Sequence, residues 1–237
     1  GKKKAIQIRI PFKHHKHSLR FKDWNRKKSV RIYKKNNRYF LELIYEKEVV
    51  YKEHSKSLGI DQGYKKLISC SDETYYGTKE LFNLYNKISK KVRGSKKYKK
   101  LLCFKETEIN RYINQFFKEH KDISDLYIED LCNVKYKSDV KRETLNSMQY
   151  WTYSLVRSRI ENLCEENGIR LHLVEPAFTS QTCSKCGYVD NKSRDKEIYH
   201  CQHCGFIIDA DYNASINILH RGVIVPLYQK HKVKKFL

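Results

Sequence analysis

The sequence predicts a mixed α/β fold with two additions: a small basic β-domain at the N-terminal end and a metal-binding ribbon near the C-terminal end. Short apolar strand-like runs alternate with helical stretches from Ser57 onward, as expected of an α/β core. The preceding residues are strand-like and basic, and two Cys-x-x-Cys pairs lie between positions 179 and 206. With 237 residues and 40% hydrophobic content, the chain can form one large or two small domains with a buried core.

The charge of the chain indicates a polyanionic partner. Lysine and arginine number 49 against 27 acids, which gives a formal net charge of +22. Such an excess attracts nucleic acid and speeds its encounter, although charge alone leaves open a soluble protein with a lysine-rich surface. The sequence has no apolar run of about 18 residues or more and no apolar stretch of a signal peptide after its first residues. We therefore expect no membrane span, no secretion, and a cytoplasmic, nucleoid-associated protein.

Residues 1–56 form the predicted basic β-domain, with 18 lysines and arginines but only 5 acids. Residues 29–35 and 38–46 alternate in strand fashion on either side of Asn36-Asn37, which predicts a β-hairpin. An edge hairpin of the main sheet is the other interpretation. The face shared by the second strand carries Tyr39, Leu41, Leu43 and Tyr45.

Residues 57–178 form the predicted α/β core. The expected elements are a strand at 58–61, a turn at Gly63, a second strand ending at Cys70, a helical insertion at 79–121, a strand at 126–130, a helix at 149–167 capped by Gly168, and a strand at 169–174. Residues 207–221 return to the core with a final helix at 210–221, and a basic tail spans 222–237.

The insertion at 79–121 is predicted to form two helices with a break near Gly94-Ser95. One apolar stripe consists of Leu81, Leu84, Tyr85, Ile88 and Val92, and the other of Ile109, Tyr112, Ile113, Phe116 and Phe117. The basic patch at 90–100 lies between the stripes, and in it Lys90, Lys91 and Arg93 are candidates for contact with a nucleic-acid backbone.

Four cysteines predict a zinc site. They form two Cys-x-x-Cys pairs with 14 residues between the pairs, Cys183 with Cys186 and Cys201 with Cys204. Thiolates at this spacing converge tetrahedrally on Zn²⁺, and a glycine follows each pair where a left-handed backbone is commonly needed. Because four thiolates leave no open coordination position, we expect one structural zinc ion in a ribbon at 179–206.

Two alternatives to this zinc site remain open from the sequence. The four cysteines could form two disulfides, or His200 or His203 could replace one cysteine as a ligand. Lys185 and Arg194 of the ribbon are further candidates for contact with nucleic acid.

Three acids occupy positions that resemble those of RNase H-type nucleases. Hydrolysis of a phosphodiester by two metal ions needs carboxylates that hold two Mg²⁺. Asp61 interrupts an apolar strand, where a bare charge is costly, Glu129 ends a later strand, and Asp211 opens the final helix. Asp209 is an alternative third acid. Each acid alone could have a structural role, for example as a helix cap, but their order around a cysteine ribbon favours a shared catalytic role.

Longer strings around these residues resemble the TnpB (OrfB) proteins of IS200/IS605 transposons, which are similar to compact type V CRISPR effectors. Residues 179–188 (TSQTCSKCGY), the second cysteine pair and residues 209–218 (DADYNASINI) are similar to motifs of that family. Gly59-Ile-Asp-Gln-Gly63 and Ile128-Glu-Asp-Leu131 resemble its first and second RuvC motifs. The resemblance covers residues 57–221.

The resemblance implies an RNA-guided, Mg²⁺-dependent DNA endonuclease with a RuvC-like (RNase H-like) core that carries the zinc ribbon. Its catalytic acids fall on Asp61, Glu129 and Asp211, with two Mg²⁺ ions as catalytic cofactors. The implied partners are a DNA target and a guide RNA, whose base pairing reads the sequence. The basic N-terminal segment is similar to the last strands of the family's wedge domain.

The chain departs from the family pattern ahead of the first RuvC motif. Only about 57 residues precede that motif, so the family's helical recognition lobe and the start of its wedge domain are not represented. The stretch between Asp61 and Glu129 is also short, and Ala214-Ser215 stands where the family has two alanines. The alternative function is therefore a cleavage-deficient guided or accessory nucleic-acid-binding protein of the same ancestry.

Overall fold

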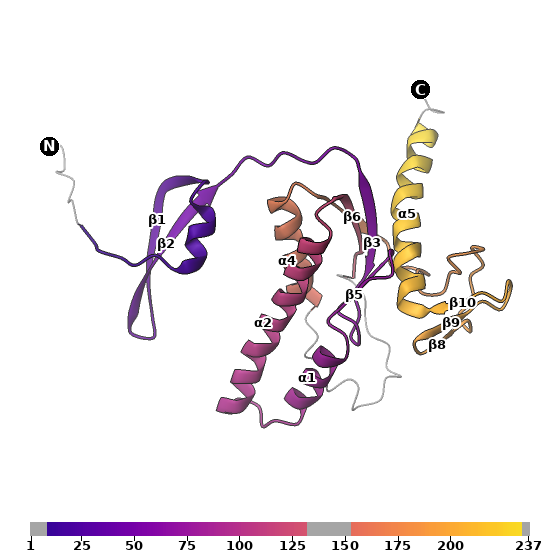
Figure 1. The fold of residues 1–237 in the computed structure, drawn as a ribbon, viewed down its shortest axis with the longest axis horizontal. Coiled ribbons are helices and arrows are strands. Elements are labelled where there is room, and N and C mark those ends of the chain that lie inside the picture. The colour runs from indigo at the N-terminus through magenta and orange to yellow at the C-terminus, as the bar shows by residue number, and fades with distance from the viewer. Residues whose placement is uncertain (1–8, 132–152, 234–237) are drawn as a thin grey trace. The chain divides into compact units, whose positions relative to one another are not determined.

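The computed structural model describes residues 9–131 and 153–233 (Figure 1). The chain divides into two units, residues 1–49 and 50–237. Within the described residues, no helix combines the length and the apolar character that crossing a membrane requires.

The first unit is an antiparallel hairpin of β1 (Asn25–Lys35) and β2 (Arg38–Glu46), preceded by a 3-10 helix at Lys16–Phe21. Asn36 and Asn37 both have a positive φ, 51° and 58°, as a tight two-residue hairpin turn requires. The predicted hairpin is confirmed, and it forms a sheet of its own rather than an edge of the main sheet. On the shared face, Leu41, Leu43 and Tyr45 are half-buried, whereas Tyr39 beside the turn is exposed.

The second unit is built on a five-stranded mixed sheet with the strand order β5-β4-β3-β6-β7. The strands are β3 (Lys56–Asp61), β4 (Ile68–Cys70), β5 (Tyr75–Tyr76), β6 (Ile123–Glu129) and β7 (Arg170–Val174). β3, β6 and β7 run parallel, while β4 and β5 are added to β3 in antiparallel order. The mixed α/β fold expected from the sequence is confirmed, and β5 is a short strand that the pattern did not predict.

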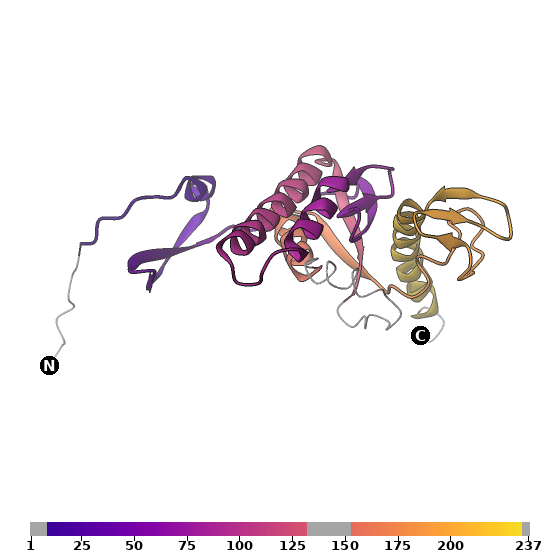
Figure 2. The ribbon, with the colours of Figure 1, turned by 90° about the horizontal axis from the view of Figure 1, so that it is seen from below.

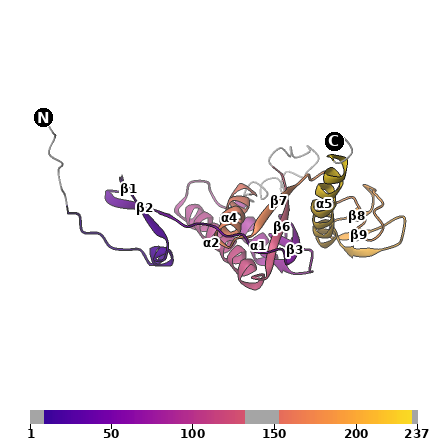
Figure 3. The same cartoon turned by 90° about the horizontal axis from the view of Figure 1, so that it is seen from above.

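Helices cover both faces of this sheet. α1 (Lys79–Ser89), α2 (Lys96–Glu119) and α4 (Tyr153–Glu166) lie on one face, and α5 (Ala210–Val233) lies on the other (Figures 2 and 3). The ribbon strands lie on the side of α5 that faces away from the sheet. Gly59 permits the close approach of α5 to β3, since a Cβ at this position would lie 2.4 Å from the carbonyl oxygen of Ser215.

Most helix boundaries match the predictions. The break between α1 and α2 falls at Gly94-Ser95, and the Ser95 hydroxyl caps α2 by accepting a hydrogen bond from the backbone N–H of Tyr98 at 3.1 Å. Val92 does not belong to the buried stripe: it lies beyond the end of α1 and is 79% exposed. Gly168 ends α4 with φ at 65°, as predicted.

The C-terminal prediction was wrong in its extent. The final helix does not end at Arg221 but continues through residues 222–233, which were assigned to a basic tail. The predicted start of the helix at 149–152 and the last residues of the chain, 234–237, lie outside the described residues.

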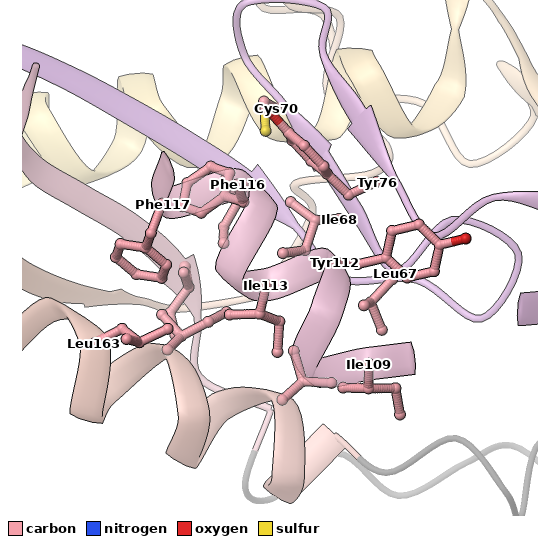
Figure 4. Packing of buried hydrophobic residues seen from close by; sticks show 14 of the residues in the cluster. Leu67, Ile68, Cys70, Tyr76, Ile109, Tyr112, Ile113, Phe116, Phe117 and Leu163 are labelled. Atoms are coloured by element: carbon pink, nitrogen blue, oxygen red, sulfur yellow. The ribbon is translucent and has the colours of Figure 1, made fainter. Parts of the chain in front are cut away.

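One core unites the α1–α2–α4 face of the sheet (Figure 4). The predicted stripe of α2 is buried and packs against Leu67, Ile68, Cys70 and Tyr76 around β4 and β5, and against Leu163 of α4. Phe116 lies edge-on to Tyr76 with ring centroids 5.7 Å apart. This packing fixes the strands whose ends carry the acids described below.

Asp125 of β6 is a buried carboxylate at the end of the sheet opposite to the predicted catalytic acids, and several basic side chains surround it. The Asp125 side chain is 4% exposed, and Arg170 of β7 holds it with Nε and Nη2 at 2.8 and 3.0 Å. His172 and His54 also approach it, at 2.9 and 3.0 Å. Burial alone would raise the pKa of Asp125, but the hydrogen bonds from Arg170 and His172 outweigh burial and hold this pKa well below its ordinary value.

We expect the substitution Asp125→Asn to lower the free energy of unfolding by about 3 kcal/mol at neutral pH, because it leaves the Arg170 guanidinium without its buried counter-charge. Since the folded-state pKa is depressed, this stabilisation is fully present above the ordinary pKa of 3.8 and is lost as pH falls below it. Urea titrations at pH 7 and pH 3 measure both effects. The control Asp130→Asn removes a more exposed partner of Arg157 and should cost less than about 1 kcal/mol. An equal loss in both variants contradicts the assignment.

Candidate functional site

The three predicted acids come from three elements that meet at one end of the sheet. Asp61 is the last residue of β3 and Glu129 the last of β6, and these neighbouring strands are parallel, so their carboxyl ends lie at the same edge. Asp211 lies in the first turn of α5, which packs across β3. The structure therefore brings together side chains that are as many as 150 positions apart in sequence.

The electrostatics of these acids indicate a site for cations. Burial, followed by the negative charges of Glu129 and Asp211, raises the pKa of Asp61 well above its ordinary value. Burial likewise raises the pKa of Glu129. A divalent cation between these carboxylates would favour the ionised forms of Asp61 and Glu129, so oxygen-preferring Mg²⁺ fits this donor set.

The acids are spaced more widely than the ligands of a single compact ion. Within the described residues, they are not among the groups whose possible ligand atoms all lie within 4.8 Å of one another. Both Glu129 and Asp211 nevertheless lie close enough to Asp61 for their negative charges to raise its pKa.

Asp209, the alternative third acid, has a different environment. It ends β10 (Ile207–Asp209), and its Oδ1 accepts hydrogen bonds from the backbone N–H groups of Asp211 and Tyr212 at 3.1 and 3.0 Å. Its Oδ2 lies 2.5 Å from Lys66 Nζ. Asp209 is therefore the N-cap of α5, one of the structural roles considered from the sequence, whereas Asp211 interacts with Asp61.

Two cations approach Asp211 in this structure. Arg194 of β8 (Arg194–Asp195) places Nη2 2.7 Å from Oδ1, and Lys66 places Nζ 3.4 Å from Oδ2. Arg194 was predicted as a nucleic-acid contact, and the structure places it at the acidic site itself. Lys66 lies in the turn between β3 and β4 and was not predicted, because its sequence position gives no sign of a partner 145 residues away.

Thr179 is a second residue that the sequence analysis did not assign. Its hydroxyl donates a hydrogen bond to Glu129 Oε1, and this bond counteracts the effect of burial by lowering the pKa of Glu129. Thr179 is itself buried. Its place at the start of the string 179–188 was the available signal, but that string was interpreted through its cysteines.

The four predicted cysteines converge on one point. Their sulfur atoms all lie within 4.8 Å of one another, with Cys183 to Cys204 at 3.8 Å and Cys186 to Cys201 at 3.6 Å. Within the described residues, no cysteine is joined in a disulfide. Four thiolates in this arrangement fit a tetrahedral zinc ion, so the donor set is compatible with the predicted metal.

Each cysteine pair forms the same tight turn. Gly187 and Gly205 have φ of 76° and 70°, the left-handed backbone expected from the sequence. The N–H of Gly187 donates to the carbonyl of Cys183 at 2.9 Å, and that of Gly205 to Cys201 at 3.0 Å. Two equivalent turns thus direct both pairs of sulfur atoms inward.

The ribbon is a three-stranded sheet, with β9 (Ile198–His200) between β8 and β10. Because β10 pairs with β9, the sheet continues to Asp209 instead of ending at the predicted Phe206. Two buried asparagines of α5 hydrogen-bond to the backbone of the ribbon segment. Asn213 bonds to Ser184 and Thr182 at 2.9 and 2.8 Å, and Asn217 bonds to Thr179 at 2.9 Å. The ribbon is therefore bonded to the helix that carries Asp211.

The remaining basic candidates lie apart from the acids in the chain. Lys90, Lys91 and Arg93 are exposed in the connection between α1 and α2. Lys185 lies in the first cysteine turn, with its ammonium 5.4 Å from the Phe206 ring centroid. Both positions are compatible with phosphate contact, and neither is tested by the geometry of the acids.

Comparison with known proteins identifies relatives of this chain. Residues 153–218 match the family model described as "Cas12f1-like, TNB domain". The chain is 35% identical over 124 residues to the CRISPR-associated endodeoxyribonuclease Cas12f1 of Sulfoacidibacillus thermotolerans. This alignment covers 50% of this chain and 28% of the relative. It is 24% identical over 234 residues to a TnpB-like protein of Aquifex aeolicus (strain VF5), covering 80% of this chain and 76% of the relative.

The chain is therefore similar to TnpB-like proteins and to type V CRISPR effectors. A solved Cas12f1–sgRNA–target DNA complex shares its fold, with a TM-score of 0.51 and 23% identity over 80% of this chain and 55% of that one. The matched segment spans about a quarter of the Cas12f1 relative and about three quarters of the TnpB-like one. The resemblance predicted from the sequence motifs is thus confirmed at the level of the family.

Proposed function

We propose that this TnpB-family chain carries the RuvC-like core of an RNA-guided DNA endonuclease. Residues 57–178 and the helix that starts at Ala210 would form the nuclease core, residues 179–209 the zinc ribbon, and residues 1–56 a wedge-like basic segment. The observation that carries the proposal is the meeting of half-buried Asp61 with Glu129 and Asp211 at one edge of the sheet, where the other two acids raise the pKa of Asp61. The name of the Cas12f1 relative, an endodeoxyribonuclease, supports the same reaction class.

Asp61, Glu129 and Asp211 would hold two Mg²⁺ ions, which when bound supply water activation and stabilisation of the leaving oxygen. Asp61, whose pKa both other acids raise, would hold the ions together with Glu129 and Asp211. Thr179 keeps the Glu129 carboxylate oriented. Arg194 and Lys66 balance the charge of Asp211 in the metal-free protein and are within reach of a phosphate bound beside it.

The four cysteines would bind one zinc ion with a structural role. The solved relative is a complex with an sgRNA and target DNA, which supports a guide RNA and a DNA target as partners of this chain. The net charge of +22 suits both polyanions. Exposed Lys90, Lys91, Arg93 and Lys185 are proposed contacts to their backbones.

A cleavage assay tests the nuclease proposal. The purified chain, with co-purifying RNA retained, is incubated with end-labelled single-stranded DNA in Mg²⁺, with and without EDTA. We expect cleavage only with Mg²⁺. Salt-sensitive DNA binding without cleavage, in a sample whose zinc content and fold are intact, would favour the cleavage-deficient alternative.

The contact of Thr179 with Glu129 gives a prediction that distinguishes a role in orienting the Glu129 carboxylate from a role in folding alone. We expect Thr179→Ala to lower the cleavage rate about tenfold and to move the acid limb of the pH–rate profile to higher pH, because loss of the donor raises the pKa of Glu129 further. Thr179→Ser keeps a hydroxyl and should retain most activity and the original profile. An unshifted profile in Thr179→Ala would mean that Thr179 only helps the chain to fold.

A further inference from the structure

A second cluster of metal-ligating side chains lies where the end of α2 meets the β4–β5 hairpin. Cys70 ends β4, Asp72 lies in the following turn, and His120 caps the C-terminal end of α2. Their sulfur, carboxylate oxygen and ring nitrogen all lie within 4.8 Å of one another. In the part of the chain that the structure describes, it is the one cluster of this kind besides the four cysteines.

The hydrogen bonds of His120 fix which ring nitrogen faces the cluster. Nδ1 lies 3.0 Å from the carbonyl oxygen of Phe116, and because a carbonyl only accepts, Nδ1 carries a proton. The other ring nitrogen, Nε2, lies 3.1 Å from Asp72 Oδ2. In a neutral ring with its proton on Nδ1, Nε2 would present a lone pair to this carboxylate oxygen, which is also an acceptor. Either a proton on Nε2 or a metal ion bound by both atoms would make this contact favourable. Histidine ligands of metals typically donate their other N–H to a backbone carbonyl, as here.

The carboxylate of Asp72 is oriented in the same way. Thr74 donates to Oδ1 through its hydroxyl at 2.8 Å and its backbone N–H at 3.4 Å, which leaves Oδ2 directed at His120. Lys56 Nζ lies 3.6 Å from Oδ2. A protonated His120 together with Lys56 is therefore the alternative source of positive charge at this carboxylate.

Burial and ligand chemistry favour a transition metal over a hard cation. Cys70 has no exposed surface, and the His120 side chain is 6% exposed (Figure 4 shows Cys70 in the packed core beside Tyr76). One sulfur, one nitrogen and one oxygen form a donor set suited to Zn²⁺, with a fourth position left for water. Mg²⁺ and Ca²⁺ prefer oxygen alone.

We propose that Cys70, Asp72 and His120 bind a second transition-metal ion of the zinc type, which ties the β4–β5 hairpin to the end of α2. Cys70 pairs with Ile60, the neighbour of Asp61, so the ion would stiffen the strand pair behind the acids. Burial raises the pKa of the Cys70 thiol to about 12, so binding must displace its proton, and this ion should bind more weakly than the one in the ribbon. The proposal does not depend on nuclease activity.

Metal analysis of the full chain tests this proposal. After equilibration with Zn²⁺ and removal of unbound metal, we expect about two equivalents of zinc in the wild type and about one in Cys70→Ala and in Asp72→Asn. The matched control is Cys164→Ala, a cysteine equally buried in the same core, which should keep both. With the ribbon already filled by Zn²⁺, added Co²⁺ should give thiolate-to-cobalt absorption in the wild type and in Cys164→Ala only.

Two results overturn the site. One is a wild type that holds a single equivalent and shows no cobalt–thiolate absorption; the other is a second equivalent retained by both Cys70→Ala and Asp72→Asn. Circular dichroism of each variant establishes that it is folded. If Cys70→Ala does not fold, Asp72→Asn decides, since its side chain is 27% exposed and the substitution retains an acceptor for Thr74.

Discussion

Replacing Asp61 with alanine is expected to abolish Mg²⁺-dependent cleavage, with a loss of about 10³-fold or more, as when a group essential to a catalytic unit is removed. Asp61 is the acid whose charge is coupled to both other acids, so its loss would disturb the binding of both metal ions. Single-turnover cleavage of labelled DNA, measured at saturating protein, reports this step directly.

The fold should survive this substitution. The raised pKa of Asp61 means that its half-buried charge opposes folding, so Asp61→Ala and Asp61→Asn are expected to unfold no earlier than the wild type in EDTA. Glu106→Gln, an exposed acid on α2, is the control and should cleave normally. Cleavage by Asp61→Ala within about tenfold of the wild-type rate contradicts the assigned role.

The coupled acids also predict how cleavage depends on pH. Because burial and like charge raise the pKa of Asp61, Mg²⁺ must displace protons when it binds. Raising the pH therefore lowers the Mg²⁺ concentration needed for half-maximal cleavage. Titrations of Mg²⁺ at several pH values measure this shift, and an unchanged midpoint between pH 6 and pH 8 argues against a protonated, metal-free site.

Elements with strong local signals could be predicted from the sequence. The Asn36-Asn37 turn, the break at Gly94-Ser95 and the left-handed glycines of the ribbon each depend on a backbone preference of the residues themselves. The end of α5 could not be predicted in this way. Residues 222–233 are helical even though a proline lies among them, and the sequence pattern gave no reason to extend the helix beyond Arg221.

The acids and cysteines were likewise predictable because their chemistry restricts residue type and order. The residues that contact these acids could not be predicted in the same way. Lys66, Thr179 and the pairing of Arg194 with Asp211 depend on how α5 and the ribbon pack on the sheet, and ordinary lysine, threonine and arginine positions carry no sign of it. The same is true of Cys70, Asp72 and His120, since Cys70 and Asp72 are separated from His120 by both α1 and α2.

Removing zinc from the four cysteines is expected to unfold the ribbon and to reduce cleavage by at least about 100-fold, comparable with the loss of one preorganised charge-stabilising group. The ribbon has little core of its own: its buried cluster consists of Cys183, Tyr199, Cys201 and Ala210, two of which are proposed zinc ligands. Structural zinc contributes roughly 10 kcal/mol or more to such small folds, which is more than the packing of this small cluster supplies.

The effect reaches the acids through the contacts at the base of the ribbon. Arg194 would leave Asp211, and Thr179, which Asn217 holds from α5, would lose its fixed position beside Glu129. A zinc-selective chelator followed by excess Mg²⁺ separates the two metals, and hydrogen exchange of residues 181–206 reports the ribbon. We expect Cys201→Ser to behave like the chelated protein and Cys103→Ser, an exposed cysteine of α2, like the wild type. Rescue by Mg²⁺ alone, or a protected ribbon without zinc, would show that zinc does not hold this part of the fold.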